Sequence, residues 1–451
     1  MSNERNGFSS RLGFVLATAG SAVGLGNIWR FPYLAAKYGG GTFLLTYLIL
    51  TLTFGFSLMI TEVALGRRAG TSAIRAFGHF NKKYTFIGYL TTLIPFIIFP
   101  YYCVIGGWVT KYALVSIQGG IHDAASDTFF TGFISKSAEP MICVLVFLIV
   151  TTLVVAGGVK GGIERVSTIM MPVLIVLLIG VSIFCITRPG AMAGVAYYIK
   201  PNLKDFSPTT ILAALGQLFY SMSLAMGIMV TFGSYMPKKS DLEKSVTQVE
   251  IFDTGVAFLA GLMIVPAVFI FSNGDSSMLA KGPSLMFVML PKVFNSMAFS
   301  SIIAAVFFIL VLLAALTSSI SLLETLVAVL MDKFHMKRGT ACITMFIVAL
   351  LLAVPSSLGF GAWSNITILG FDFLDFFDFI SNSVLMPIAA FLTCIFVGYI
   401  IKPKVIVDEV ESSGEFKRKP LFLVMVKYIA PICIVAILVF SVLEGLGFIT
   451  V

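Results

Sequence analysis

The chain has 451 residues, of which 58% are hydrophobic and only 12% charged, and its mean hydropathy is +1.00. An ordinary soluble domain is less apolar, so this composition excludes such a domain and predicts a protein of the lipid bilayer. The formal net charge of +8 does not call for a nucleic-acid partner, because lysine and arginine concentrate in alternate connections between apolar runs. The positive-inside rule assigns these connections to the cytoplasm: residues 67–83, 160–165, 238–244, 333–338 and 402–419.

Apolar runs that can cross a hydrocarbon core of roughly 30 Å, which takes about 20 helical residues, recur along the chain. Runs such as 141–155 and 301–316 are continuously apolar, which predicts helices rather than the alternating strands of a membrane barrel. We therefore predict an all-α membrane protein with about eleven transmembrane helices, a cytoplasmic N-terminus and an extracytoplasmic C-terminus. In chain order, the spans begin near Ser9, Gly41, Thr85, Pro140, Ile163, Pro208, Ser245, Ser296, Thr340, Gly370 and Lys419.

The first span is expected to stay in the mature protein, because it lacks a signal-peptide cleavage pattern and contains Asn27 and Arg30 at membrane depth. The six cysteines all lie in predicted spans, so neither a disulfide nor a thiolate metal site is expected. The three histidines lie in predicted loops, and no phosphate-binding glycine-rich loop with a lysine occurs. The sequence therefore predicts neither an enzyme nor an ATP-driven pump.

Two spans contain residues that should interrupt a membrane helix near its middle. Residues 19–32 include three glycines, an amide, an arginine and a proline, and residues 216–227 are rich in hydroxyls and small side chains. Single glycines and hydroxyls in membrane helices usually serve close packing, but such dense clusters favour binding sites. A broken helix presents the positive end of one half to an anion and leaves carbonyl oxygens of the other half for a cation. One break can therefore bind a carboxylate and a sodium ion side by side.

Several motifs resemble those of the neurotransmitter:sodium symporters, and the short chain resembles their bacterial branch. The matching residues are 11–13, 19–32, 39–41, Glu62, 66–67, 101–102, 160–165, 217–227 and 316–319. The resemblance implies the leucine-transporter-like fold, a 5+5 inverted repeat with broken helices 1 and 6 and one accessory helix. The implied segments are a cytoplasmic gate segment (1–8), the first repeat (9–187), an extracellular connection (188–207), the second repeat (208–401), a cytoplasmic loop (402–418) and the accessory helix (419–451).

The resemblance also implies two sodium ions. The first ion would contact the substrate carboxylate and a set of four residues, Ala22, Asn27, Ser221 and Asp253. The second would be bound by the carbonyls of Gly20, Val23 and Ala314 and the hydroxyls of Thr317 and Ser318. The alternative for these two hydroxyls is hydrogen bonding to carbonyls of their own helix.

Asp253 departs from the pattern of many relatives, which have a neutral amide at this place and need chloride nearby. A carboxylate here can balance the sodium charge itself, so chloride is not expected to be required. Tyr47, Gln217 and Ser221 still outline the region where relatives hold the anion. The alternative is that Asp253 is a solvated carboxylate at the end of its span.

The resemblance places the substrate carboxylate at the amides of Leu25 and Gly26 and at the hydroxyl of Tyr102. Gly24 stands where monoamine carriers have an aspartate, which favours an amino acid over a biogenic amine. Ala22 and Ser221 would contact substrate as well as sodium. The side-chain pocket would be lined by a mixed apolar and hydroxyl set that fits a neutral side chain: Ser21, Ile98, Tyr220, Ser223, Ala225, Met226, Ser318, Ser319 and Leu322.

Alternating access needs a closed gate on each side of the site. Outside, Arg30 is expected to pair with Asp378, with Asp375 as the competing carboxylate and Tyr220 capping the substrate. Inside, Arg5 is expected to pair with Asp332, and Phe8 to pack beneath them.

The sequence thus predicts a symporter of the inner membrane that imports a neutral amino acid with sodium. Its predicted partners are the substrate, sodium ions and the lipid bilayer, and no nucleic acid. Three alternatives stay open: a nutrient sensor, an ion channel, and a sodium-dependent carrier of another small carboxylate or zwitterion.

Overall fold

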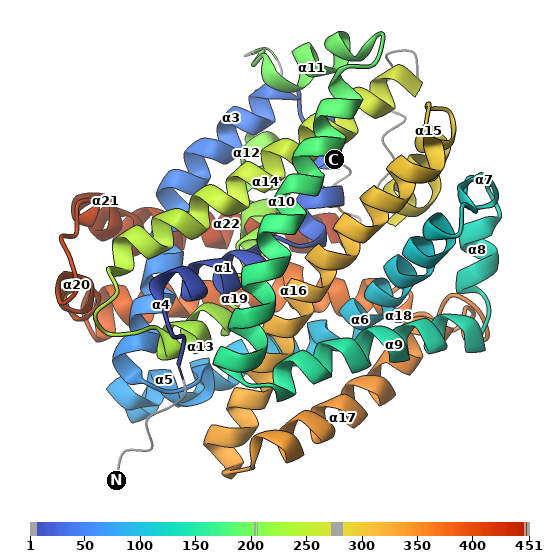
Figure 1. The fold of residues 1–451 in the computed structure, drawn as a ribbon. Coiled ribbons are helices and arrows are strands. Elements are labelled where there is room, and N and C mark those ends of the chain that lie inside the picture. Colours follow the sequence, from blue (N-terminus) through green and yellow to red (C-terminus); the bar gives the residue numbers. More distant parts are fainter. Residues whose placement is uncertain (1–6, 203, 205, 272–282, 446–447, 449–451) are drawn as a thin grey trace.

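The computed structural model describes residues 7–202, 204, 206–271, 283–445 and 448, and these residues form an almost entirely helical protein (Figure 1). Within these residues, the only pairing of extended backbone is an isolated bridge between Ile368 and Phe371. The predicted all-α class is confirmed.

Nine helices or runs of contiguous helices in the described residues are long and apolar enough to cross a membrane. They are Gly41–Ala69 (α3, η2 and α4), Lys82–Ile117 (η3 and α6), Ala138–Ala156 (α9), Val159–Ile186 (η4 and α10), Leu242–Phe271 (α14), Ser300–Phe334 (α16), Arg338–Leu358 (α17), Phe373–Ile400 (α18, η8, α19 and η9) and Lys419–Gly445 (α21, η10 and α22). Shorter helices lie in the connections: α5 (Ala73–Phe80), α7 (Ile121–Ala124), α8 (Phe129–Ile134), α11 (Ala191–Ile199), η7 (Leu285–Met289), α15 (Leu290–Asn295) and α20 (Lys404–Glu411).

Two further pairs of helices lie at the predicted breaks. The first pair consists of α1 (Arg11–Ala22) and the segment Gly26–Lys37 (η1 and α2), which meet at a bend of 55° and together are long and apolar enough to form a tenth span. The second pair consists of α12 (Pro208–Ser221) and α13 (Ile228–Tyr235), separated by residues 222–227. With 14 and 8 residues, neither helix can span the bilayer alone, and the eleventh span stays a prediction. The division into two inverted repeats at the stated boundaries stays a prediction.

Local sequence explains why α1 ends where it does. The Ser10 hydroxyl accepts from the Gly13 amide and caps the start of the helix. At the end, Val23 is extended, and the Gly24 amide donates to the side-chain oxygen of Asn27 (3.1 Å). In a continuous helix that amide would bond to the Gly20 carbonyl. An asparagine three residues ahead thus replaces the helical partner.

The break after α12 has a strained backbone. Ser223 and Ala225 have positive φ angles of 52° and 61°, which residues other than glycine rarely adopt, and Gly227 follows with a φ of 72°. Two contacts hold this conformation. The Ala225 amide donates to the Glu62 carboxylate on α4 (2.7 Å), and the Ser223 hydroxyl donates to the Ser21 carbonyl on α1 (3.0 Å).

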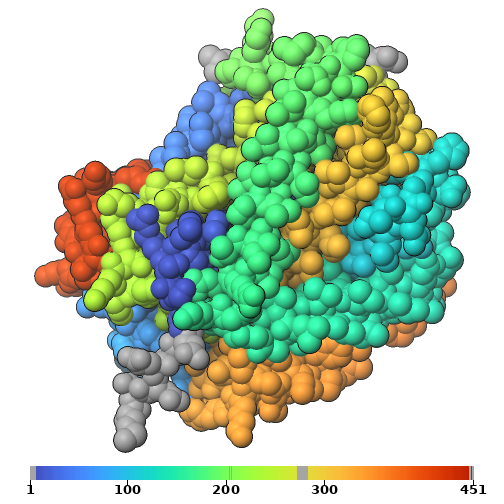
Figure 2. Space-filling model, in the orientation of Figure 1, coloured from blue at the N-terminus to red at the C-terminus, as the bar shows by residue number. Residues whose placement is uncertain are grey.

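The broken first span lies inside the bundle. α1 packs against α10, α14 and α16, and α6 and α16 pack along each other. In Figure 2, α10 crosses the middle of the visible face, and the start of α1 shows between α10 and α14. The breaks are therefore surrounded by protein, as irregular backbone at membrane depth requires.

The backbones of α4 and α13 touch. A Cβ atom at Gly66 would lie 1.8 Å from the Val230 carbonyl oxygen, and one at Gly233 would lie 2.3 Å from the Val63 carbonyl oxygen. Only glycine fits at either place, so small residues let these two helices approach more closely than side chains allow.

Candidate functional site

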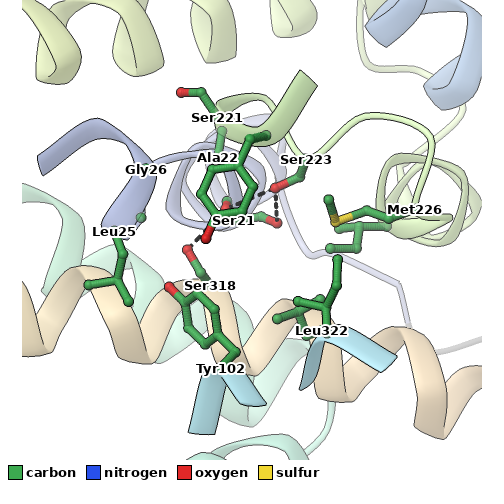
Figure 3. Close-up of a pocket in the computed structure, with 14 residues that line it drawn as sticks. Ser21, Ala22, Leu25, Gly26, Tyr102, Ser221, Ser223, Met226, Ser318 and Leu322 are labelled. Atoms are coloured by element: carbon green, nitrogen blue, oxygen red, sulfur yellow. Dashed lines mark hydrogen bonds between the residues drawn. The ribbon is translucent and has the colours of Figure 1, made fainter. Parts of the chain in front are cut away.

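A cavity of about 40 Å³ lies where the two breaks face α6 and α16 (Figure 3). A water molecule needs roughly 10–15 Å³ on this scale, so the space admits only a few waters. It is lined by Ser21, Ala22, Gly24, Leu25, Gly26, Ile98, Tyr102, Tyr220, Ser221, Ser223, Met226, Ile228, Ser318 and Leu322.

The structure gathers all the predicted substrate-binding residues around this cavity except Ala225 and Ser319. The Ala225 amide is bonded to Glu62, which holds this residue of the break away from the cavity. The Ser319 hydroxyl contacts Thr151 on α9 (2.8 Å), because one step along α16 turns the side chain away from Ser318. Neither residue lines the cavity in this structure, and their place in the substrate pocket stays a prediction. Ile228, at the start of α13, lines the cavity but was missed.

Asp253 is fully buried beside the cavity and links both breaks. One carboxylate oxygen accepts from the Asn27 side-chain amide and from the Ser221 hydroxyl, each at 2.8 Å, and the other accepts from the Tyr47 hydroxyl at 3.3 Å. No lysine or arginine pairs with it in the part of the chain that the structure describes, whereas Glu250, one turn away on α14, pairs with Arg418. The alternative of a solvated helix-end carboxylate is wrong. A buried carboxylate of this kind needs a positive charge to remain ionised.

A second group of oxygens surrounds Ser318 on α16. Its hydroxyl lies 3.4 Å from the Gly20 carbonyl oxygen, 3.1 Å from that of Ser21 and 3.4 Å from that of Val23. A hydroxyl has one hydrogen and cannot satisfy three acceptors fully at once. An excess of acceptors over donors favours a cation at this place.

Thr317 lies next to this group and faces Gly20, where an added Cβ atom would lie 3.2 Å from the Thr317 Cβ. Its hydroxyl bonds to the carbonyls of Ala314 (3.0 Å) and Leu313 (3.2 Å). The back-bonding alternative is therefore present in this structure. It is compatible with cation binding, because a hydroxyl that donates to its own helix keeps lone pairs for an ion.

Polar groups that can hold an anion also line the cavity. The Tyr102 hydroxyl is buried, faces Gly24 and has no hydrogen-bond partner of normal geometry in the described structure. Leu25 and Gly26, at the start of the second half of the first span, lie beside the cavity in Figure 3. The Gln217 amide donates to the Gly26 carbonyl (2.9 Å) and ties the second broken span to the first.

Glu62 has a structural role that the sequence did not assign. It is buried on α4, and one of its oxygens accepts from Ala225 in the second break. The signal in the sequence was a lone carboxylate in the apolar run 56–66. Glu62 thus replaces a helical carbonyl as the partner of a backbone amide.

The predicted direct ion pair of the outer gate is not formed. The Arg30 guanidinium lies over the ring of Tyr220, 5.4 Å from its centroid. Asp378 accepts instead from the Tyr101 hydroxyl (3.1 Å) and the Asn382 amide (2.6 Å), so its carboxylate is already supplied with donors. The backbone amide of the competing Asp375 donates to the Asp372 carboxylate, which caps the start of α18.

On the inner side, Arg5 lies outside the described residues, so its pairing with Asp332 stays a prediction. Asp332 accepts from the Thr71 hydroxyl (2.9 Å) and the Ser72 amide (2.7 Å). Phe8 is buried, and its amide donates to the Tyr235 carbonyl (3.0 Å). Its ring packs edge-on against Phe14, Phe232 and Tyr235.

A helical membrane fold with a cavity between two broken helices is typical of membrane transporters. Residues 5–132 and 128–446 match the sodium:neurotransmitter symporter family. The uncharacterized sodium-dependent transporter YhdH of Bacillus subtilis is 36% identical over 438 residues, which cover 95% of this chain and 96% of that protein. The chain belongs to the sodium:neurotransmitter symporter family, and its transport is sodium-dependent.

Two further relatives bear on the site. The human sodium- and chloride-dependent GABA transporter 2 is 24% identical over 496 residues, which cover 98% of this chain and 80% of that protein. The crystal structure of MhsT in complex with L-phenylalanine is similar with a TM-score of 0.87 at 39% identity, covering 97% of this chain and 100% of that chain. The leucine-transporter-like fold predicted from the sequence is confirmed.

Proposed function

We propose that this protein is a symporter that imports a neutral amino acid together with two sodium ions. The observation that carries the proposal is the buried Asp253, which has no basic partner in the described residues and is hydrogen-bonded to Asn27 and Ser221 from the two breaks. A sodium ion there would supply the missing charge and would lie next to the cavity. The second ion would be bound by the carbonyl oxygens of Gly20 and Val23 near Ser318.

The cavity supports an amino acid as the substrate. Its carboxylate would be held by the amides of Leu25 and Gly26 and by the unpaired hydroxyl of Tyr102. The remaining wall combines hydroxyls with apolar side chains and has no charged residue, which fits a neutral side chain. Crystals of the related MhsT contain L-phenylalanine, and the same class of ligand is proposed here.

The proposed transport cycle uses gates on both sides of the cavity. Tyr220, with Arg30 over its ring, would cap the outer side. Phe8 and its aromatic neighbours would close the cytoplasmic side. The proposed location is the inner membrane. By the positive-inside rule, the N-terminus lies on its cytoplasmic side and the C-terminus on the opposite side. Chloride is not needed in this proposal, since Asp253 supplies the negative charge.

The test is uptake of a panel of labelled amino acids into proteoliposomes with an inward sodium gradient. We expect one or a few neutral amino acids to accumulate, and accumulation to stop when the gradient is collapsed. Sodium-dependent binding without accumulation would favour a sensor. Accumulation of a small carboxylate without an amino group would overturn the substrate assignment but leave sodium coupling intact.

Replacing Tyr102 by phenylalanine is expected to lower substrate affinity by about ten- to a hundredfold. The hydroxyl proposed to bond the substrate carboxylate is lost, and a hydrogen bond to a charged group contributes roughly 1.5–3 kcal/mol. The measurement is equilibrium binding of the transported amino acid at saturating sodium.

Tyr112→Phe is the matched control. Tyr112 is also buried on α6, but its hydroxyl donates to the Phe287 carbonyl (2.7 Å) and does not line the cavity. We expect its affinity for substrate to be that of the wild type. Unchanged affinity in Tyr102→Phe would show that Tyr102 only packs.

A further inference from the structure

A second cleft, of about 430 Å³, opens on the surface where α4 ends and α6 begins, with α5 between them. It shares no residue with the cavity between the breaks. Its walls are formed by Ala69, Thr71, Arg75, Gly78, His79 and Thr85. All of these except Thr85, the first residue of α6, lie in one of the basic connections that the positive-inside rule assigns to the cytoplasm.

Basic side chains surround this cleft. Arg75 and His79 are exposed one helical turn apart on α5, and Lys82 and Lys83 are exposed directly after it. Among the described residues, no carboxylate forms an ion pair with any of these four side chains. The charges of Arg75, Lys82 and Lys83 are therefore available to an anion from outside the chain, and the His79 ring can donate a hydrogen bond to it.

One carboxylate lies close by and has to be weighed against these cations. Asp332 accepts from the hydroxyl of Thr71, which lines the cleft, and from the Ser72 amide. The next residue, Lys333, adds a cation on the same side, and its ammonium group donates to the Tyr89 hydroxyl (2.5 Å). Basic side chains outnumber this carboxylate, so the cleft region is positive overall.

The cleft also adjoins a surface that faces lipid. Phe86, Tyr89 and Leu93 follow one side of α6 at helical spacing and are 50%, 46% and 44% exposed. Exposed apolar side chains on a membrane span contact acyl chains, and aromatic ones are typical of the level of the headgroups. Thr85 in the cleft wall directly precedes Phe86. An anion in the cleft therefore lies at the membrane boundary, beside an apolar track.

We propose that this cleft binds the phosphate of an anionic phospholipid. Arg75, His79 and Lys82 hold the headgroup, and the acyl chains run along Phe86, Tyr89 and Leu93. The shape of the region favours a lipid over a free anion, because a charged cleft and an apolar track meet at one point. With the predicted orientation, the lipid belongs to the cytoplasmic leaflet, where anionic headgroups attract basic segments.

The test uses the purified full-length transporter and native mass spectrometry, with dioleoylphosphatidylglycerol and dioleoylphosphatidylcholine as probes. Each basic residue near a membrane surface contributes about fivefold to the attraction of anionic lipid, so Arg75→Gln with Lys82→Gln should lower phosphatidylglycerol affinity by roughly 25-fold. The matched control is Lys160→Gln with Lys404→Gln, which removes two exposed charges from other basic connections. Because neither residue lines the cleft, the affinity should change by less than about twofold. Size-exclusion profiles identify any variant that does not fold.

Three outcomes would overturn the proposal. The first is phosphatidylglycerol affinity that is equal in the wild type and in the Arg75→Gln, Lys82→Gln variant. The second is an equal loss in the control variant, which would assign the effect to net charge. The third is that phosphatidylcholine binds as well as phosphatidylglycerol, or that glycerol 1-phosphate displaces the lipid at equal concentration, because the cleft would then not select an anionic lipid.

Discussion

Asp253→Asn is expected to lower sodium affinity by about a thousandfold in chloride-free medium while the transporter stays folded. At an effective dielectric constant near 20, a unit charge about 4 Å from the ion contributes roughly 4 kcal/mol. The substitution changes little else, since an asparagine oxygen can accept from Asn27 and Ser221 and its amide group can donate to Tyr47. The loss therefore reports charge and not packing.

Chloride should partly restore sodium binding in this variant. The hydroxyls of Tyr47 and Ser221, which now donate to the carboxylate, can donate to an anion close to the same place. A related animal protein, the human GABA transporter 2, is described as sodium- and chloride-dependent. Asp253 would accordingly carry the charge that chloride brings elsewhere.

The measurement is sodium-dependent substrate binding in chloride and in gluconate, for the wild type and for Asp253→Asn. Glu250→Gln is the control, because it neutralises a carboxylate on the same helix that is already paired with Arg418. We expect its sodium affinity to fall far less than that of Asp253→Asn, because Glu250 does not line the cavity and its charge is already balanced by Arg418. The charge argument is wrong if the wild type needs chloride, or if Asp253→Asn binds sodium normally in gluconate.

Thr317→Ala is expected to reduce concentrative uptake to background. It removes a hydroxyl that is proposed to bind the second sodium ion, and a polar contact to a charged group contributes roughly 1.5–3 kcal/mol, so sodium affinity should fall by about ten- to a hundredfold. Thr317→Ser keeps the hydroxyl and should retain transport. The measurements are uptake into sodium-gradient proteoliposomes and the sodium concentration that half-saturates substrate binding.

Thr325→Ala is the matched control for this prediction. Thr325 is a buried threonine on α16 whose hydroxyl also bonds to its own helix, at the Ser321 carbonyl (2.9 Å), but it lies two turns beyond Thr317. Both variants lose the same atoms, so a general effect on helix packing would appear in both. Wild-type accumulation in Thr317→Ala, or equal losses in both variants, would remove the second sodium site from the proposal.

Much of this fold could be predicted from residue types alone. Membrane helices follow from long apolar runs, and the two breaks follow from residues 19–32 and 216–227, because dense helix-breaking and polar groups at membrane depth are costly unless the backbone there is irregular and buried in protein. The helix α1, of twelve residues, ends at Ala22, inside the predicted break at residues 19–32. The burial of Asp253 could not be predicted in this way, since a carboxylate near a span end is compatible with both water and protein.

The two residues that were predicted for the pocket but do not line the cavity, Ser319 and Ala225, both differ from the prediction in the direction they face. Ser319 and Ser318 are adjacent and chemically equal, yet the turn of the helix sends one to Thr151 and the other to the carbonyls of α1. The amide of Ala225 is bound by Glu62 on α4, and Ala225 does not line the cavity. The direction of each group depends on which residues from distant parts of the chain pack beside it, and a local sequence pattern does not contain this information.

The contact between α4 and α13 has a mechanical consequence for the transport cycle. Because Gly66 and Gly233 leave no side chain between them, the two backbones lie in direct contact. Glu62 on α4 also binds the Ala225 amide just before α13 begins. We therefore expect α13 and α4 to move together as one rigid body when the cavity opens. The bend would then fall between the end of α12 and Ala225, at residues 222–224.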